Sequence, residues 1–306
     1  MVSVYVEGAG ERLPSTGAAA VAGRALGAIP PTVQILIGIV SVQAGAALAK
    51  QLFAVAGPAG TVALRLFFAA VVLLLMWRPV QEARRLGRRG WLVVLAYGVV
   101  LGLMNLCFYM ALARIPQGIT VTIEFLGPLT VALAGSRRLL DALWALLAAG
   151  GAVLLTETRG DLSLVGILFA LGAAVCWGGY ILLGSALGNR TSGGNGLALG
   201  MAAAALVATP AGIAQTGSAL LSPTVLAVGL AVALLSSVVP YSLELEALRR
   251  IPPRVFGVLM SLEPAVGALA GFVVSGELLH PLQWLALCCV MAASIGATRS
   301  TSKNGR

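Results

Sequence analysis

Charged residues, histidine and cysteine are scarce in this chain. Only 10% of its 306 residues are charged, against roughly 25% in ordinary soluble domains, and 59% are hydrophobic, with a mean hydropathy of +0.97. This composition excludes a soluble fold and indicates an integral membrane protein. The single histidine and the four cysteines, which lie in apolar stretches without CxxC spacing, form no metal-ligand pattern. We therefore expect no metal and no cofactor.

Enzyme motifs are also missing. The chain has no HExxH motif, no paired aspartates in apolar stretches and no histidine in the middle of one. These absences argue against an intramembrane enzyme, so we expect no catalytic residues. The formal charge of +9 does not indicate a nucleic-acid partner, because the basic residues lie in short loops between apolar stretches, where they set membrane orientation. The expected surroundings are the lipid bilayer, without nucleic acid, and the sequence leaves the oligomeric state open.

Ten apolar segments are long enough to cross a bilayer, for which about 20 residues are needed, or somewhat fewer with tilt. Backbone polar groups must be satisfied within the membrane, which favours helices over irregular chain. The sequence therefore predicts an all-α membrane protein with ten transmembrane helices, at residues 32–49, 58–77, 91–112, 118–135, 139–155, 163–186, 195–214, 223–243, 253–274 and 280–297.

An internal repeat relates the two halves of the chain. Residues 111–135 align without a gap to residues 247–271, at a constant offset of 250 − 114 = 136 residues, and each copy carries a carboxylate and a proline in an apolar helix. Interrupted hydrophobic segments at corresponding places in two halves are typical of a transporter's binding site. We expect two five-helix repeats, over residues 32–155 and 163–297.

The loop charges predict the orientation of these repeats. Basic residues gather in the loops of one side, while only Lys50, Arg114 and Arg159 fall on the other. By the positive-inside rule both tails, residues 1–31 and 298–306, are cytoplasmic. Because each half has an odd number of spans, the halves have opposite orientations, which is a 5+5 inverted repeat.

Three ionisable residues lie deep in the predicted spans, where an unpaired charge is costly. Arg65 either forms a salt bridge with Glu124, which has a similar depth, or binds a substrate carboxylate through its planar guanidinium. Glu124 and Glu263 could each bind a substrate ammonium in one state and a proton in the other. A scaffold protein would have no reason to keep such residues in lipid.

Other polar residues have a structural and a functional interpretation side by side. Glu246 is interpreted as an interfacial acid neutralised by Arg249 and Arg250, whereas the deeper Glu244 fits a cavity equally well. Lys50 is expected to reach the outer interface, with a role in a gate as the minor alternative, and Glu277 is interpreted as a loop charge. The remaining candidates for the lining of a binding site could instead hydrogen-bond neighbouring helices: Gln43, Asn105, Tyr109, Trp177, Tyr180 and Tyr241.

The combination of several segments resembles a known family. SVQAGAALAKQLF, the TVALRLF stretch with Arg65, GLMNLCFYMAL, VTIEFLGPLTVAL, PYSLELEAL and FGVLMSLEPAVGALAGFVVSGELL are together similar to the inner-membrane threonine and homoserine exporter group, in the EamA branch of the drug/metabolite transporter superfamily. The resemblance runs from about residue 41 to about residue 297. The glutamate–proline motif occurs throughout the superfamily, whereas the combination of segments in the first half resembles the amino-acid exporters more specifically.

The resemblance and the buried charges together predict a secondary transporter that exports small amino acids by alternating access, either as a facilitator or as a proton antiporter. Arg65 would bind the substrate carboxylate, and Glu124 or Glu263 the ammonium or a proton. Pro128 and Pro264 would act as hinges between inward-open and outward-open states. The alternative is a multidrug or other small-metabolite exporter of the same superfamily, although Arg65 would repel a cationic drug.

Overall fold

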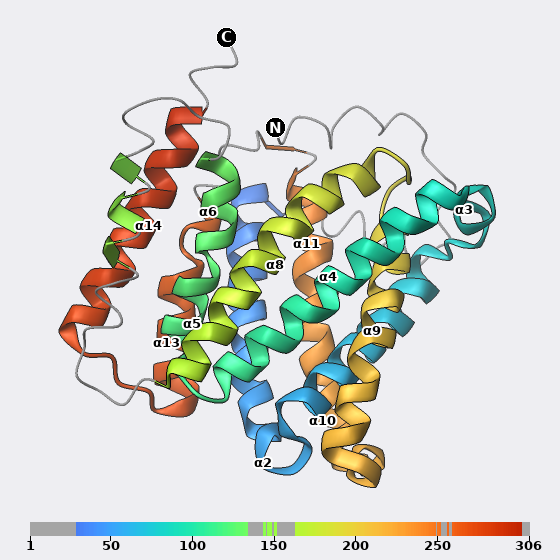
Figure 1. Ribbon diagram of the computed structural model, residues 1–306, viewed down its shortest axis with the longest axis horizontal. Helices are drawn as coiled ribbons and strands as arrows, with labels where there is room; N and C mark the ends of the chain where they lie inside the picture. Colours follow the sequence, from blue (N-terminus) through green and yellow to red (C-terminus); the bar gives the residue numbers. More distant parts are fainter. Residues whose placement is uncertain are drawn as a thin grey trace.

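The computed structural model describes residues 29–133, 143–144, 146–148, 150–151, 163–248, 250–251, 256 and 259–301. Every described element is a helix (Figure 1). In chain order these are α2 Pro31–Trp77, α3 Val80–Arg85, α4 Arg88–Leu112, α5 Gln117–Glu124, α6 Leu126–Leu133, α8 Leu164–Gly188, α9 Asn195–Thr216, the 3-10 helix η2 Gly217–Leu221, α10 Pro223–Ala233, the π-helix η3 Leu234–Val238, α11 Val239–Leu248, α13 Glu263–Ser275 and α14 Pro281–Thr301.

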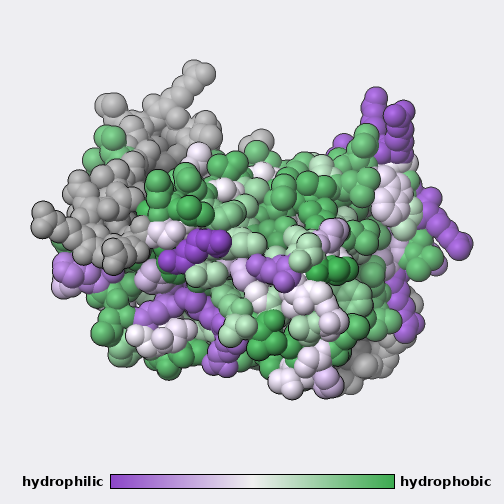
Figure 2. Space-filling model, turned by 60° about the horizontal axis from the view of Figure 1, so that its bottom comes forward, coloured by the Kyte–Doolittle hydropathy of each residue, from purple (hydrophilic) through white to green (hydrophobic). Residues whose placement is uncertain are grey.

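Five helical stretches are long and apolar enough to cross a membrane: Pro31–Trp77, Arg88–Leu112, Leu164–Gly188, Asn195–Leu221 and Pro223–Glu244. Large apolar side chains lie open on their outer faces, among them Leu75, Val175 and Leu206. Figure 2 shows apolar surface around separate hydrophilic patches on the face that comes forward. A surface of this kind suits lipid, so the chain is a multi-pass membrane protein.

The predicted break between the first two spans is present as a kink at Gly57, where two helices meet within α2, and the first of them continues beyond residue 49 to this kink. Helix α2 continues through a kink at Gly57, whose backbone has φ 62° and ψ 170° and is followed by Pro58. Glycine adopts positive φ without steric cost, and proline is favoured at the start of a helix. The side chain of Gln215 accepts a hydrogen bond from the Ala59 N–H at 2.7 Å, which satisfies a donor freed by the kink.

The predicted fourth span is interrupted in its middle. Helix α5 ends at Glu124 and α6 begins at Leu126, with Phe125 in a turn between them. Proline has no backbone N–H, so Pro128 leaves the carbonyl of Glu124 without its intrahelical donor. The chain before α13 repeats this arrangement: a turn precedes Glu263, and Pro264 removes the donor for the carbonyl of Met260. Residues 134–142, most of 145–162 and most of 252–258 lie outside the described part, which leaves more than half of the predicted span 139–155 undescribed.

Small residues allow the central helices to approach closely. A Cβ atom on Gly98 of α4 would lie 2.3 Å from the side chain of Ala203 on α9, and one on Gly200 would lie 2.3 Å from the Tyr97 ring. These close approaches leave no room for a larger side chain at either position and make both glycines helix-contact residues. Helix α2 begins, and α11 and α14 end, at the upper end of the bundle in Figure 1, whereas α5 begins and α13 ends near its lower end.

Candidate functional site

The guanidinium of Arg65 lies in the interior of the bundle and joins three elements. The residue is 6% exposed on α2. Its Nε donates to Ser237 Oγ at 3.1 Å, Nη1 donates to the Tyr109 hydroxyl at 3.2 Å and Nη2 donates to the Ser236 carbonyl at 2.9 Å. Its central carbon also lies 5.4 Å from the centre of the Tyr109 ring, within range of a cation–π contact.

Local backbone geometry explains why the Ser236 carbonyl is available. In an α-helix it would accept from the N–H of residue 240, but that residue is Pro240. The π-helix η3 places the Val239 N–H on the Leu234 carbonyl, so the Leu235 carbonyl also lacks a donor. Ser41 donates its hydroxyl to Leu235 at 2.7 Å, and Arg65 donates to Ser236. The π-helix thus presents two carbonyl oxygens to α2, as single-turn π segments do at functional sites.

The hydrogen bonds of Arg65 with the protein leave some N–H donors of its guanidinium unused. A guanidinium carries five N–H donors, one on Nε and two on each terminal nitrogen. The contacts with the protein use one donor on each nitrogen, which leaves one N–H on Nη1 and one on Nη2. Two parallel donors on the terminal nitrogens are the arrangement that binds a carboxylate in a bidentate manner.

Three carboxylates and the Arg65 guanidinium share one neighbour, Tyr241, and Glu124 also interacts electrostatically with Arg65 itself. The Tyr241 hydroxyl on α11 is within electrostatic range of four charged side chains, Arg65, Glu124, Glu244 and Glu263. Glu124 and Glu263 are 8% and 6% exposed, and Glu263 Oε2 is buried without a hydrogen-bond partner among the described residues. With every carboxylate ionised the group would carry −3 + 1 = −2 charges. A bound ammonium or bound protons would lower this unfavourable charge in lipid.

The alternative of a salt bridge between Arg65 and Glu124 is not realised. Across the described ranges no carboxylate oxygen lies within 4.0 Å of the Arg65 guanidinium, and the ion pairs there join Lys50 to Glu277 and Arg250 to Glu246. Arg65 and Glu124 interact electrostatically at longer range. The guanidinium is therefore anchored by neutral oxygen atoms, and its charge remains available to an anionic ligand.

A buried amide pair links α2 to α5. Gln117 donates through Nε2 to both the carbonyl and the side-chain oxygen of Gln43, each at 2.9 Å. A Cβ atom on Gly267 of α13 would lie 3.0 Å from the Gln43 side-chain oxygen. Gln43 thus lies where three helices meet, and its amide is directed by Gln117.

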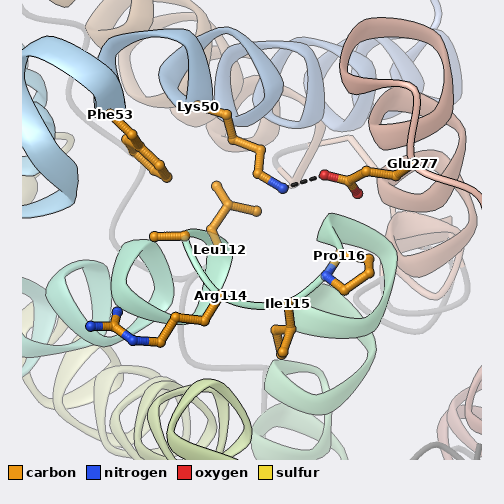
Figure 3. Close-up of a pocket in the computed structure, with 8 residues that line it drawn as sticks. Lys50, Phe53, Leu112, Arg114, Ile115, Pro116 and Glu277 are labelled. Atoms are coloured by element: carbon orange, nitrogen blue, oxygen red, sulfur yellow. Dashed lines mark hydrogen bonds and ion pairs between the residues drawn. The ribbon is translucent and has the colours of Figure 1, made fainter. Parts of the chain in front are cut away.

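A second polar site lies below this amide pair. The backbone N–H of Gln117 donates to Glu277 Oε2 at 2.7 Å, and Glu277 Oε1 pairs with the Lys50 ammonium. The ion pair borders a cavity of about 300 Å³ (Figure 3), which is lined by Lys50, Phe53, Leu112, Ala113, Arg114, Ile115, Pro116 and Glu277. Lys50 therefore forms an ion pair at this end of the bundle, and Glu277, which lies in the loop between α13 and α14 as expected, is held by two partners.

Comparison with known proteins identifies the family. The sequence matches the EamA-like transporter family over residues 30–156 and again over residues 164–299. The chain belongs to the EamA-like transporter family. Two of its relatives, the threonine/homoserine exporters RhtA of Escherichia coli (strain K12) and Salmonella typhimurium (strain LT2), are each 44% identical to it. The alignments cover 90% and 88% of this chain and 94% and 91% of the respective relatives.

A solved crystal structure shares the fold. It is 20% identical in sequence to this EamA-like transporter, with a TM-score of 0.55, and the alignment covers 88% of this chain and 99% of the other. At this identity the likeness concerns the arrangement of helices alone.

Some predicted site residues of this EamA-like transporter make other contacts. Asn105 donates to the Leu101 carbonyl of its own helix at 2.9 Å. Trp177 packs edge-on against Phe125 at 5.6 Å, beside the break that follows Glu124, so it lies near the site. Tyr180 instead contacts the Tyr97 ring at 5.0 Å. Glu246 pairs with Arg250 at 2.7 Å, which confirms the predicted neutralisation by Arg250, whereas Arg249 lies outside the described residues.

Four residues of the EamA-like site were not predicted from the sequence: Gln117, Ser236, Ser237 and Glu277. Gln117 lies one residue before the predicted fourth span, and the two serines resemble the many small polar residues of membrane helices. A usable signal exists for Ser236, because a proline four residues later frees its carbonyl.

Proposed function

We propose that this EamA-like transporter exports threonine, homoserine or similar small amino acids across the cytoplasmic membrane. The observation that carries the proposal is 44% identity to the E. coli threonine/homoserine exporter over 94% of that protein. Both termini would be cytoplasmic, and ten helices in a 5+5 inverted repeat would alternate between inward-open and outward-open states.

In this proposal Arg65 binds the substrate carboxylate with the two donors that the protein leaves unused. Ser237, Tyr109 and the Ser236 carbonyl hold the guanidinium in a fixed orientation, which reduces the entropy cost of binding. A zwitterion is favoured over a lipophilic cation, because it supplies a partner for the Arg65 guanidinium as well as for the carboxylates, whereas a cation leaves the guanidinium without an anionic partner. This argues against the multidrug alternative.

The substrate ammonium would bind among Glu124, Glu244 and Glu263, with Tyr241, Gln43 and Asn105 as further hydrogen-bonding groups. Glu124 or Glu263 would carry a proton when the ammonium is absent, which is the basis for antiport. A pure facilitator would need no such exchange. The aromatic side chains of Trp177 and Tyr180 would border the path along α8.

Pro128 and Pro264 would allow the two interrupted helices to bend between states. Each removes one backbone hydrogen bond next to a buried glutamate, so bending there breaks no existing bond. Movement at these breaks would change the position of Glu124 and Glu263 relative to Arg65.

Binding to the purified protein tests the substrate class directly. L-Threonine and L-homoserine should raise its melting temperature, because a ligand bound only to the folded state stabilises it. Threoninol, which lacks the carboxylate, should have little effect, and Arg65→Ala should abolish the rise caused by threonine. Equal stabilisation by threonine and threoninol would contradict carboxylate recognition.

A further inference from the structure

The cavity at the lower end of the bundle is separate from the Arg65 site and carries both signs of charge. Its volume of about 300 Å³ is at the lower end of the usual range for small-molecule pockets, about 300–1,000 Å³. In Figure 3 Lys50 and Glu277 point toward each other across one side of the cavity, while Arg114 points away from them. The orientation proposed above makes this the extracytoplasmic end.

The ion pair is partly shielded from solvent, since the Lys50 and Glu277 side chains are 20% and 14% exposed. The two partners are held differently. Glu277 is anchored through its second oxygen by the Gln117 N–H at 2.7 Å, and that oxygen lies against Gly271. Lys50 makes no other polar contact with the described residues. Glu277 therefore keeps its position when Lys50 moves away.

We propose that Lys50 and Glu277 form an exit subsite for the zwitterionic amino acid, which enters by replacing their ion pair. The ligand ammonium takes the place of the Lys50 ammonium on Glu277 Oε1, and the ligand carboxylate binds the released Lys50. One ion pair becomes two, so no charge is left without a partner. This inference rests on the proposed function and adds a second place on the export path where both charges of the substrate are recognised.

Replacement of the ion pair also has a mechanical consequence. Lys50 belongs to α2, whereas Glu277 follows α13 and is bonded to the start of α5. When an amino acid separates them, α2 loses its direct ionic link to the α13 end while the link between Glu277 and α5 persists. The outgoing substrate thus loosens the contact that closes its own exit.

Arg114 provides a matched control within the same cavity. Its Nη1 donates to the Met110 carbonyl at 2.6 Å, and its guanidinium lies 5.2 Å from the centre of the Phe169 ring on α8. These contacts hold the side chain against its own helix and α8. Substitution of Arg114 therefore removes a charge from the cavity wall without removing a partner of the Lys50–Glu277 pair.

Charge-deleted analogues distinguish the two partners. Right-side-out membrane vesicles with the full-length protein are loaded with radiolabelled threonine, and exchange is measured against external threonine, threoninol or 2,3-dihydroxybutanoate. Threonine carries both charges, threoninol carries the ammonium alone and 2,3-dihydroxybutanoate carries the carboxylate alone. For the wild type, threonine should act at a concentration more than tenfold lower than either analogue, because the Arg65 site and the subsite each recognise both charges and one charge-assisted hydrogen bond accounts for about tenfold.

Each variant should lose the share of one preference that the subsite supplies, while the Arg65 site keeps its own share. In Glu277→Gln the preference for threonine over the dihydroxy acid should fall about tenfold, and in Lys50→Gln the preference for threonine over threoninol should fall about tenfold. The double variant Lys50→Gln/Glu277→Gln, which has no unpaired charge to disturb folding, should show both reductions, and Arg114→Gln should keep the wild-type preferences. Unchanged preferences in the single and double variants, with threonine efflux intact, would overturn the subsite alone. Absence of threonine and homoserine efflux from the wild type would overturn the proposed function, and the subsite with it.

Discussion

Arg65 donates a hydrogen bond of 2.9 Å to the carbonyl of Ser236, a group that Pro240 leaves without a helical donor. This hydrogen bond joins α2, in the first predicted repeat, to the π-helix η3, in the second predicted repeat. A missing N–H in one helix thus orients a charged side chain of another. In the proposed mechanism this contact sets the direction of the fork that receives the substrate carboxylate.

Pro240→Ala should reduce threonine transport although it touches no substrate. The alanine N–H can bond to the Ser236 carbonyl and displaces Arg65 Nη2, a loss of about 1.5–3 kcal/mol for a hydrogen bond to a charged group. Initial efflux rates should fall roughly tenfold or more. Pro223→Ala is the control, because Pro223 is the first residue of α10, where a missing N–H breaks no helical bond. Equal rates for the two variants would contradict the role given to Pro240.

Arg65→Lys should lose most transport while keeping the positive charge. A lysine ammonium cannot make the three contacts with Ser237, Tyr109 and Ser236 and also present two parallel donors. We expect an increase of at least about tenfold in the threonine concentration that gives half-maximal exchange. Arg114→Lys is the control, since Arg114 lies outside the Arg65 site. Near-normal affinity in Arg65→Lys would show that charge alone, without the fork, is sufficient.

Much of the central site could be predicted because charged side chains within a bilayer cost free energy and are therefore conspicuous in apolar segments. Arg65, Glu124 and Glu263 stand out in apolar segments, and the structure brings all three near Tyr241. Gln117 and Glu277 were missed because they lie just outside the predicted spans, where polar residues are ordinary. The first predicted span ends too early because Lys50 and Gln51 suggest a helix end, whereas the helix continues to the kink at Gly57 and Lys50 is neutralised by a glutamate 227 positions away. Such long-range pairing leaves no local pattern.

Replacement of the buried carboxylates should affect proton coupling and transport differently. If Glu124 or Glu263 exchanges a proton for the substrate ammonium, its replacement by glutamine should abolish the response of threonine efflux to an imposed proton gradient. Downhill exchange should persist at a reduced rate. Glu246→Gln is the control, because Glu246 pairs with Arg250 and is partly exposed. A wild-type gradient response in both Glu124→Gln and Glu263→Gln would remove these residues from coupling.

The two proline breaks should matter for turnover more than for binding. Pro128→Ala and Pro264→Ala restore a backbone donor to the carbonyls of Glu124 and Met260, so each helix becomes straighter and stiffer. We expect a higher melting temperature, a several-fold slower exchange rate and little change in threonine affinity. Pro31→Ala, at the start of α2, should change none of these quantities. Faster exchange in either variant would contradict a hinge at that proline.

The most direct test of substrate class is efflux from one preparation of vesicles loaded together with radiolabelled threonine, radiolabelled homoserine and a fluorescent lipophilic cation. Efflux is followed with and without an imposed proton gradient, and vesicles without the protein give the background. We predict efflux of both amino acids above background and none of the cation, with the gradient reporting whether transport is coupled to protons. Efflux of the cation without either amino acid would show that this EamA-like transporter exports a different class of solute.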